Sequence, residues 1–106
     1  MDCLNGFFHD VYTQSLAESL MLAPNGGAVA VWASSGLTDP TPQVTLNQGA
    51  LSIQFSHPSL AVGDVIRLSK AGVNNSDVRQ TWIFFGDPAM HLKAVPPSAP
   101  SRRALR

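Results

Sequence analysis

The sequence predicts a small layered α/β domain in which apolar strands alternate with helices. Two apolar segments, residues 28–33 and 81–85, have the short, uninterrupted pattern of strands covered on both faces, and 28–33 is the best candidate for a central parallel strand. The chain has 106 residues, of which only 13% are charged and 44% are hydrophobic, so it supplies little polar surface. With so few strands both faces of a sheet are hard to close, so we expect an incomplete domain that a missing half would complete.

The charge balance and the apolar runs exclude several classes of partner. The 7 Lys and Arg residues balance the 7 Asp and Glu residues, so we expect no nucleic-acid partner. The longest strongly apolar stretch, residues 28–33, is far shorter than the roughly 20 residues that cross a bilayer, so we expect no membrane partner. One cysteine rules out an internal disulfide and a Cys-rich zinc site, and the carboxylates are not clustered, so we expect neither a metal nor a cofactor.

The first part of the chain predicts a strand end, a turn and a helix. The Asn-Gly pair at 5–6 is a strong turn signal, which places Cys3 at the junction between a preceding strand and a loop. Ser15 and Glu18 fit the capping box, in which each side chain satisfies a backbone amide at a helix start. We therefore expect a helix over residues 15–23, ended by a Pro-Asn-Gly-Gly turn.

The region between the two strands predicts two helices. Thr41 is the expected N-cap of the first, with Pro42 as its first helical residue, and this helix extends to about Phe55. The second spans residues 60–71 and ends at Gly72. The apolar residues expected on the buried side of the first helix are Val44, Leu46, Leu51 and Phe55.

The last elements are a turn and a strand. Residues 74–77 predict a turn before the strand at 81–85. Trp32 and Trp82 lie on the two strands and are expected in the core rather than in a binding site. Asp87 follows the second strand, where we expect its side chain to hold the backbone turn by an Asx-type hydrogen bond.

Cys3 is the candidate nucleophile. At a strand end before a Gly-containing turn, a thiol can project and its own backbone N–H can face a developing oxyanion, an arrangement that suits acyl transfer. The alternative is a small buried apolar residue. A nucleophilic thiol needs an imidazole partner, but His9, His57 and His91 are each better explained as surface or structural residues. If Cys3 is catalytic, we expect its base to lie outside this chain.

Taken together, four segments resemble, in order and spacing, the C-terminal part of the catalytic domain in the gingipain family of cysteine peptidases. They read CLNGFF at 3–8, SLAESL at 15–20, GAVAVWASS at 27–35 and TWIFFGDP at 81–88. We accordingly assign residues 1–94 to the C-terminal portion of a gingipain-like peptidase domain. Residues 95–106 read as a Pro-rich linker or disordered tail.

The resemblance implies a caspase-like layered sheet with flanking helices and proteolysis through an acyl-enzyme on the catalytic thiol, Cys3. It also implies that Ser34, Ser35, Gly36 and Leu37 contact the substrate, which is a peptide or a protein. In the family the catalytic His precedes the Cys, and this sequence begins two residues before Cys3. We therefore expect a missing N-terminal part as partner, and a chain that is inactive alone. The family further implies secretion or a cell-surface location.

Two other functions stay open at this point. A decayed or truncated lobe of such a domain would serve as a non-catalytic structural or interaction module. A stand-alone small α/β binding domain with an incidental cysteine is the third interpretation, and exposed sheet edges and large apolar patches argue against it because they favour association.

Overall fold

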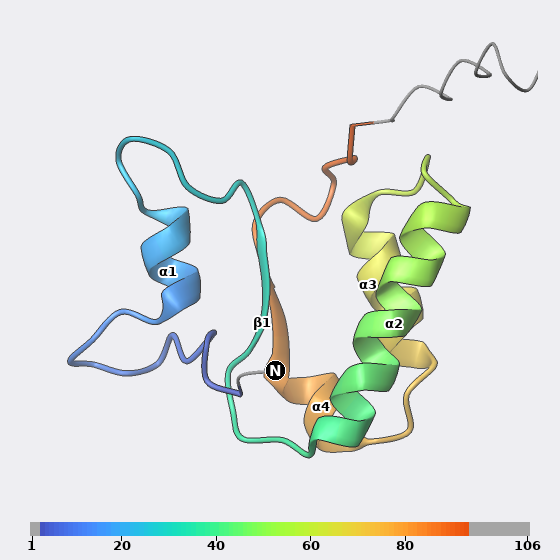
Figure 1. Ribbon diagram of the computed structural model, residues 1–106, viewed down its shortest axis with the longest axis horizontal. Helices are drawn as coiled ribbons and strands as arrows, with labels where there is room; N and C mark the ends of the chain where they lie inside the picture. Colours follow the sequence, from blue (N-terminus) through green and yellow to red (C-terminus); the bar gives the residue numbers. More distant parts are fainter. Residues whose placement is uncertain (1–2, 94–106) are drawn as a thin grey trace, which may run out of the picture.

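The computed structural model describes residues 3–93, which form an α/β arrangement with a two-stranded sheet between helices (Figure 1). This confirms the predicted fold class. The strand expected to end before Cys3, and the tail at 95–106, lie outside the described residues. In chain order the elements are α1 (Leu16–Met21), β1 (Val31–Ser34), α2 (Pro40–Ser56), α3 (Val62–Ala71), α4 (Ser76–Thr81) and β2 (Trp82–Phe85).

The sheet pairs β1 with β2 in antiparallel register, with Val31 opposite Phe85 and Ser34 opposite Trp82. The prediction of a parallel strand over 28–33 is therefore wrong for the pairing found within residues 3–93. The strand begins later than expected, and Val29 is 80% exposed instead of covered. An apolar run indicates burial, but it carries no information about the direction of the neighbouring strand.

One face of the sheet packs against α2, α3 and α4. Its core cluster joins Trp82 of β2 to Leu46, Val73 and Val78, and Trp32 of β1 packs against this cluster. The two indole rings are 5.4 Å apart at their centroids. Both tryptophans are thus core residues, as predicted. Burying such large apolar surfaces is the main force that holds the sheet to the helices.

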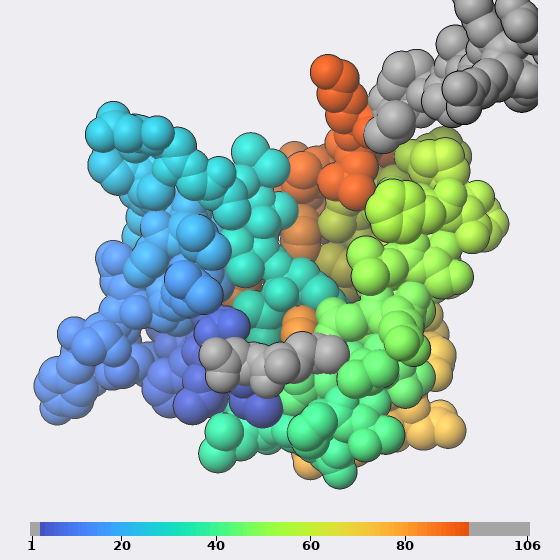
Figure 2. Space-filling model, viewed as in Figure 1, coloured from blue at the N-terminus to red at the C-terminus, as the bar shows by residue number. Residues whose placement is uncertain are grey.

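The other face of the sheet is covered by the N-terminal segment and α1, which lie on the opposite side of β1 from α2 and α3 (Figures 1 and 2). The Gly6 N–H donates to the Ser34 carbonyl at 2.9 Å. A Cβ at Gly6 would lie 3.1 Å from the Cβ of Ala33, so the close approach depends on glycine. Further along, the ring of Phe8 meets that of Phe85 edge to face.

The capping box predicted for α1 is present. Ser15 Oγ accepts from the Glu18 N–H, and the Glu18 carboxylate accepts from the Ser15 N–H at 2.8 Å. The helix ends at Met21, two residues earlier than expected. Gly27, with φ of 153°, then turns the chain so tightly that a Cβ there would collide with the Leu20 carbonyl oxygen.

α2 begins at Pro40, because Asp39 and not Thr41 is its N-cap and accepts from the Thr41 N–H at 2.9 Å. Its predicted buried side is correct only for Leu46. The residues of α2 that are buried are Gln43, Leu46 and Gln54, whereas Val44, Leu51 and Phe55 are exposed. Within residues 3–93, the buried face of α2 is therefore partly polar and partly apolar. The exposed apolar side chains Val44, Leu51 and Phe55 form a stripe on its solvent side. Within residues 3–93 no helix combines the length and apolar content that a bilayer span requires.

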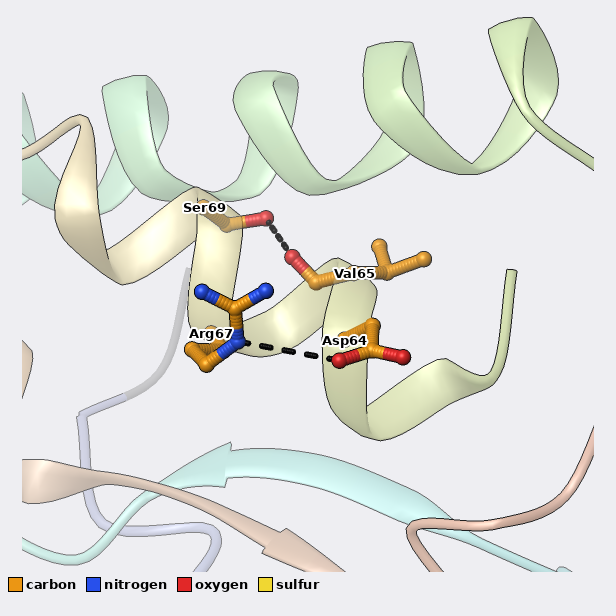
Figure 3. Close-up of polar contacts among 4 residues, drawn as sticks. All are labelled: Asp64, Val65, Arg67 and Ser69. Atoms are coloured by element: carbon orange, nitrogen blue, oxygen red, sulfur yellow. Dashed lines mark hydrogen bonds and ion pairs between the residues drawn. The ribbon is translucent and has the colours of Figure 1, made fainter.

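α3 and α4 complete the helical layer. α3 ends at Gly72 as predicted, and Ser69 on its buried side satisfies its hydroxyl by donating to the Val65 carbonyl at 2.6 Å (Figure 3). The turn expected at 74–77 is in fact the start of α4, since Asn75 caps a short helix. Four turn-forming residues fit a helix N-terminus as well as they fit a turn.

Candidate active site

Cys3 is half-buried at the point where the N-terminal segment meets the loop after β1 and the first turn of α2. Its Sγ lies 3.5 Å from the Thr38 carbonyl oxygen, toward which the thiol donates. Gln43 Nε2 donates to the sulfur from 3.2 Å. Two parts of the chain that are 35 to 40 positions apart in sequence therefore meet at one thiol.

The loop after β1 is held in place by its own polar groups. Ser34 Oγ donates to the Gly36 carbonyl at 2.8 Å, and Ser35 donates to the Thr81 carbonyl from both its N–H and its hydroxyl. Asp39 then starts α2. Hydrogen bonds hold the loop at both ends, by Ser35 at its start and by Asp39 at the N-cap of α2. Thr38 lies between these two points and therefore has a defined position beside Cys3.

The residues predicted to contact substrate differ sharply in exposure. Ser34 and Ser35 are buried, and their hydroxyls are engaged in the bonds just described. Gly36 is half-buried, with the Thr81 methyl group 3.1 Å from where its Cβ would be. Leu37 is 79% exposed. Of these four residues, Leu37 therefore offers the most exposed side chain on the loop.

The three histidines of the chain lie on segments other than those that carry Thr38 and Gln43. The ring of His9 packs at a tilt against Phe7 and meets Phe8 edge to face. Phe8 in turn contacts Phe85, at the end of the sheet opposite Ser34. His57 caps the far end of α2, a 17-residue helix, and is therefore about 20 Å from the turn that carries Gln43. His91 follows β2, beyond the same distant end of the sheet.

The start of α2 gives the sulfur a side-chain amide instead of backbone N–H groups. Residues 40 and 42 are prolines without an N–H, and the Thr41 N–H is used by Asp39. The Asp39 carboxylate caps this helix end and offsets its positive dipole, so the Gln43 amide is the donor that the start of α2 offers to the sulfur.

A hollow of about 270 Å³ lies beside β1 on the side of α1. It is lined mainly by apolar side chains, including Leu16, Leu20, Val31 and Trp82. Trp82 Nε1 is buried without a hydrogen-bond acceptor among residues 3–93. No group of three or more His, Cys, Asp or Glu residues in the described part of the chain is placed to hold a metal ion.

Comparison with known families places the chain in one of them. The family model described as Peptidase family C25 matches residues 1–93. The chain belongs to peptidase family C25. This is the gingipain family, so the resemblance seen in the sequence is confirmed, and the chain derives from a cysteine peptidase. No curated protein and no solved structure matches it.

Two neighbours of Cys3 in this C25 chain, Thr38 and Gln43, escaped prediction from sequence. Both are polar residues next to a proline-rich helix start, a context typical of solvent-exposed positions. The one local signal was the Asp-Pro pair at 39–40, which sets the true start of α2 and thereby the direction of Gln43. Asp87 was predicted correctly, since its carboxylate accepts from the Ala89 N–H at 2.9 Å.

Proposed function

We propose that this chain is the nucleophile-bearing part of a gingipain-like cysteine endopeptidase, with Cys3 as the nucleophile. The observation that carries the proposal is the environment of the thiol in a C25 chain. The sulfur is half-buried and receives an N–H from Gln43. It lies beside a loop whose start is held by the hydrogen bonds of Ser35 to Thr81. A thiol used only for packing would be surrounded by apolar groups, whereas this one faces polar donors and acceptors.

In the proposed reaction the Cys3 thiolate attacks the carbonyl carbon of a peptide bond. The C–N bond breaks, a thioester forms, and an imidazolium gives its proton to the leaving amine. Water then attacks the thioester, which releases the carboxylic acid and returns the sulfur to its starting state. The Cys3 backbone N–H is the proposed donor to the oxyanion.

The imidazole comes, in this proposal, from a part of the peptidase domain that precedes Cys3. The positions of His9, His57 and His91 support this, because each is on an element that leads away from the thiol. The chain alone is then inactive as a peptidase. The alternative, a non-catalytic module derived from such a domain, predicts that no upstream segment restores activity.

The proposed contact surface for the missing part is the edge of β1 that is unpaired among the described residues, next to the hollow and α1. Within residues 3–93, β1 pairs on one edge only, and the hollow lies beside it. Leu16 and Leu20 of α1 are 53% and 39% exposed, and the buried Trp82 Nε1 lacks an acceptor. A further strand on this side would cover the apolar groups and provide carbonyl oxygens.

A turnover assay tests the proposal. Peptide hydrolysis is compared for the purified chain, for a longer chain that adds the upstream segment in the native reading frame, and for the longer chain carrying Cys3→Ser. We expect turnover only in the longer chain with its cysteine. Equal turnover with and without the thiol, or none in a folded longer chain, refutes the proposed function.

The proposed role of the loop at residues 34–37 is to form one side of the substrate pocket, next to the bond that is cleaved. Because Ser34 and Ser35 are buried, Leu37 and the Gly36 backbone are the groups that would touch it. Leu37→Ala in the longer chain is expected to raise KM severalfold with a smaller effect on kcat. An unchanged KM across a panel of peptides would remove Leu37 from the site.

A further inference from the structure

Gln43 is a fully buried polar residue on α2, with 0% of its surface exposed. Burying an amide is unfavourable unless both its oxygen and its nitrogen find hydrogen-bond partners. Here Oε1 has none among the described residues, so one half of the amide is left unsatisfied. The hydrogen bonds of this side chain are made by its other half, the Nε2 group.

The Nε2 group is turned toward Cys3 and Thr38. It lies 3.2 Å from Cys3 Sγ, 3.0 Å from the Thr38 carbonyl oxygen and 2.6 Å from Thr38 Oγ1. A carbonyl oxygen can only accept, so the amide atom beside it must be the nitrogen. The NH₂ group has two hydrogens for these three acceptors, so it shares them between Thr38 and the Cys3 sulfur.

The contacts of the sulfur respond in opposite ways to loss of its proton. The thiol donates toward the Thr38 carbonyl, and that contact becomes unfavourable once the sulfur carries a negative charge and no hydrogen. The N–H from Gln43 becomes stronger, because hydrogen bonds to a charged acceptor are about twice as strong as neutral ones. Gln43 therefore favours the reactive form of Cys3 and Thr38 the resting form.

We propose that Gln43 is the positioning residue of the nucleophile: its side-chain amide orients the Cys3 sulfur and stabilises it as a thiolate. This inference rests on the proposed function for its catalytic meaning, but the contact itself is measurable without any peptidase activity. Gln43 acts through Cys3 and does not touch the substrate.

The pH dependence of alkylation tests the proposal on the full chain. Cys3 is the only cysteine, so the rate of reaction with iodoacetamide reports on this thiol alone. For Gln43→Met we expect the midpoint of the pH–rate profile to rise by about one pH unit, with a roughly tenfold lower rate at pH 7. An unchanged midpoint in a folded variant overturns the proposal.

Gln54→Met is the matched control. Gln54 is also a buried glutamine on α2, 8% exposed, but it lies three turns further along the helix. Its replacement is expected to leave the midpoint unchanged. If Gln54→Met moves the midpoint as far as Gln43→Met does, the effect comes from loosening the helix and the proposal fails.

A measurement on the unsubstituted chain covers the case in which Gln43→Met does not fold. The side-chain NH₂ resonances of Gln43 are followed by NMR as the pH is raised. We expect them to shift with the same midpoint as the alkylation rate, and to stay still in Cys3→Ser. Resonances that do not titrate in the native chain overturn the proposal.

Failure of this inference is distinguishable from failure of the proposed function. In the active longer chain, Gln43→Met is expected to lower kcat about tenfold at neutral pH, to shift the pH profile to higher pH and to leave KM unchanged. Turnover with an unshifted profile refutes the role of Gln43 alone. A shifted alkylation midpoint in a longer chain without turnover refutes the peptidase proposal and leaves the contact established.

Discussion

Ser35 donates twice to the carbonyl oxygen of Thr81, from its backbone N–H at 2.8 Å and from its hydroxyl at 2.9 Å. The two residues are 46 positions apart, and they join the end of β1 to the last turn of α4. This link fixes the start of the loop that runs past Cys3. The shape of the candidate site therefore depends on it.

Ser35→Ala removes the hydroxyl bond and keeps the backbone bond. We expect the free energy of unfolding to fall by about 1 kcal/mol, because the Thr81 carbonyl keeps one donor. Urea denaturation measures this change. Ser52→Ala, at an exposed position of α2, is the control and is expected to stay within about 0.5 kcal/mol of the native chain. Equal effects at the two positions would show that the link to Thr81 adds no stability.

Leu46→Ala tests where the core lies. Leu46 has no exposed surface, so we expect its truncation to lower the free energy of unfolding by about 2 to 5 kcal/mol. Leu51→Ala on the same helix removes a side chain that is 59% exposed and is expected to cost less than about 1 kcal/mol. If Leu51 were as costly as Leu46, the exposed stripe of α2 would be covered in solution, for example by a second copy of the chain.

Ser15→Ala tests the start of α1. The variant loses the hydroxyl that accepts from the Glu18 N–H, and we expect a loss of about 1 kcal/mol with faster amide hydrogen exchange confined to α1. Ser19→Ala, within the same helix, is expected to leave the exchange of α1 unchanged. Uniform acceleration across the chain in Ser15→Ala would instead mean that α1 opens only by global unfolding.

Lys70 makes the free energy of unfolding depend on pH in the alkaline range. Burial lowers its pKa below the usual value, while its Nζ lies 5.4 Å from the centre of the Trp32 ring. Between the lowered folded pKa and the unfolded value of about 10.4, the unfolded chain binds more protons, so stability rises with pH in that window.

The measurement compares Lys70→Met with the native chain. We expect the native chain to gain stability relative to the variant as the pH rises through the lowered pKa of Lys70 toward about 10.4, as measured by urea denaturation. Lys93→Met, at an exposed position, serves as the control and should follow the native curve. A native curve parallel to that of Lys70→Met would contradict the lowered pKa.

Local signals in the sequence predicted the parts of the fold whose causes are local. The capping box of Ser15 and Glu18, the helix stop at Gly72 and the Asx turn at Asp87 each depend on atoms within a few residues. Long-range packing was predicted less well. Residues 28–33 read as a buried strand, but the direction of its partner is set by Trp82–Phe85, some 50 positions away.

The same division applies to the candidate site. Cys3 was predicted to be the nucleophile from its expected strand-end position and from the family resemblance, and this stays a prediction. Its contact with Gln43 spans 40 positions and joins a thiol to a residue type that is mostly found on surfaces. Val44, Leu51 and Phe55 show the converse error, since apolar residues at helical spacing predicted burial that the described part of the chain does not provide.

The most direct test of the central claim, that Cys3 is the nucleophile of a peptidase, is labelling with a peptide acyloxymethyl ketone. The purified chain and the longer chain with its upstream segment are treated side by side, with iodoacetamide as a measure of general thiol access. We predict that both react with iodoacetamide, that only the longer chain reacts with the peptide probe, and that Cys3→Ser abolishes the labelling. A folded longer chain that reacts with iodoacetamide but not with any peptide probe would contradict the account and leave Cys3 as a residue of a non-catalytic module.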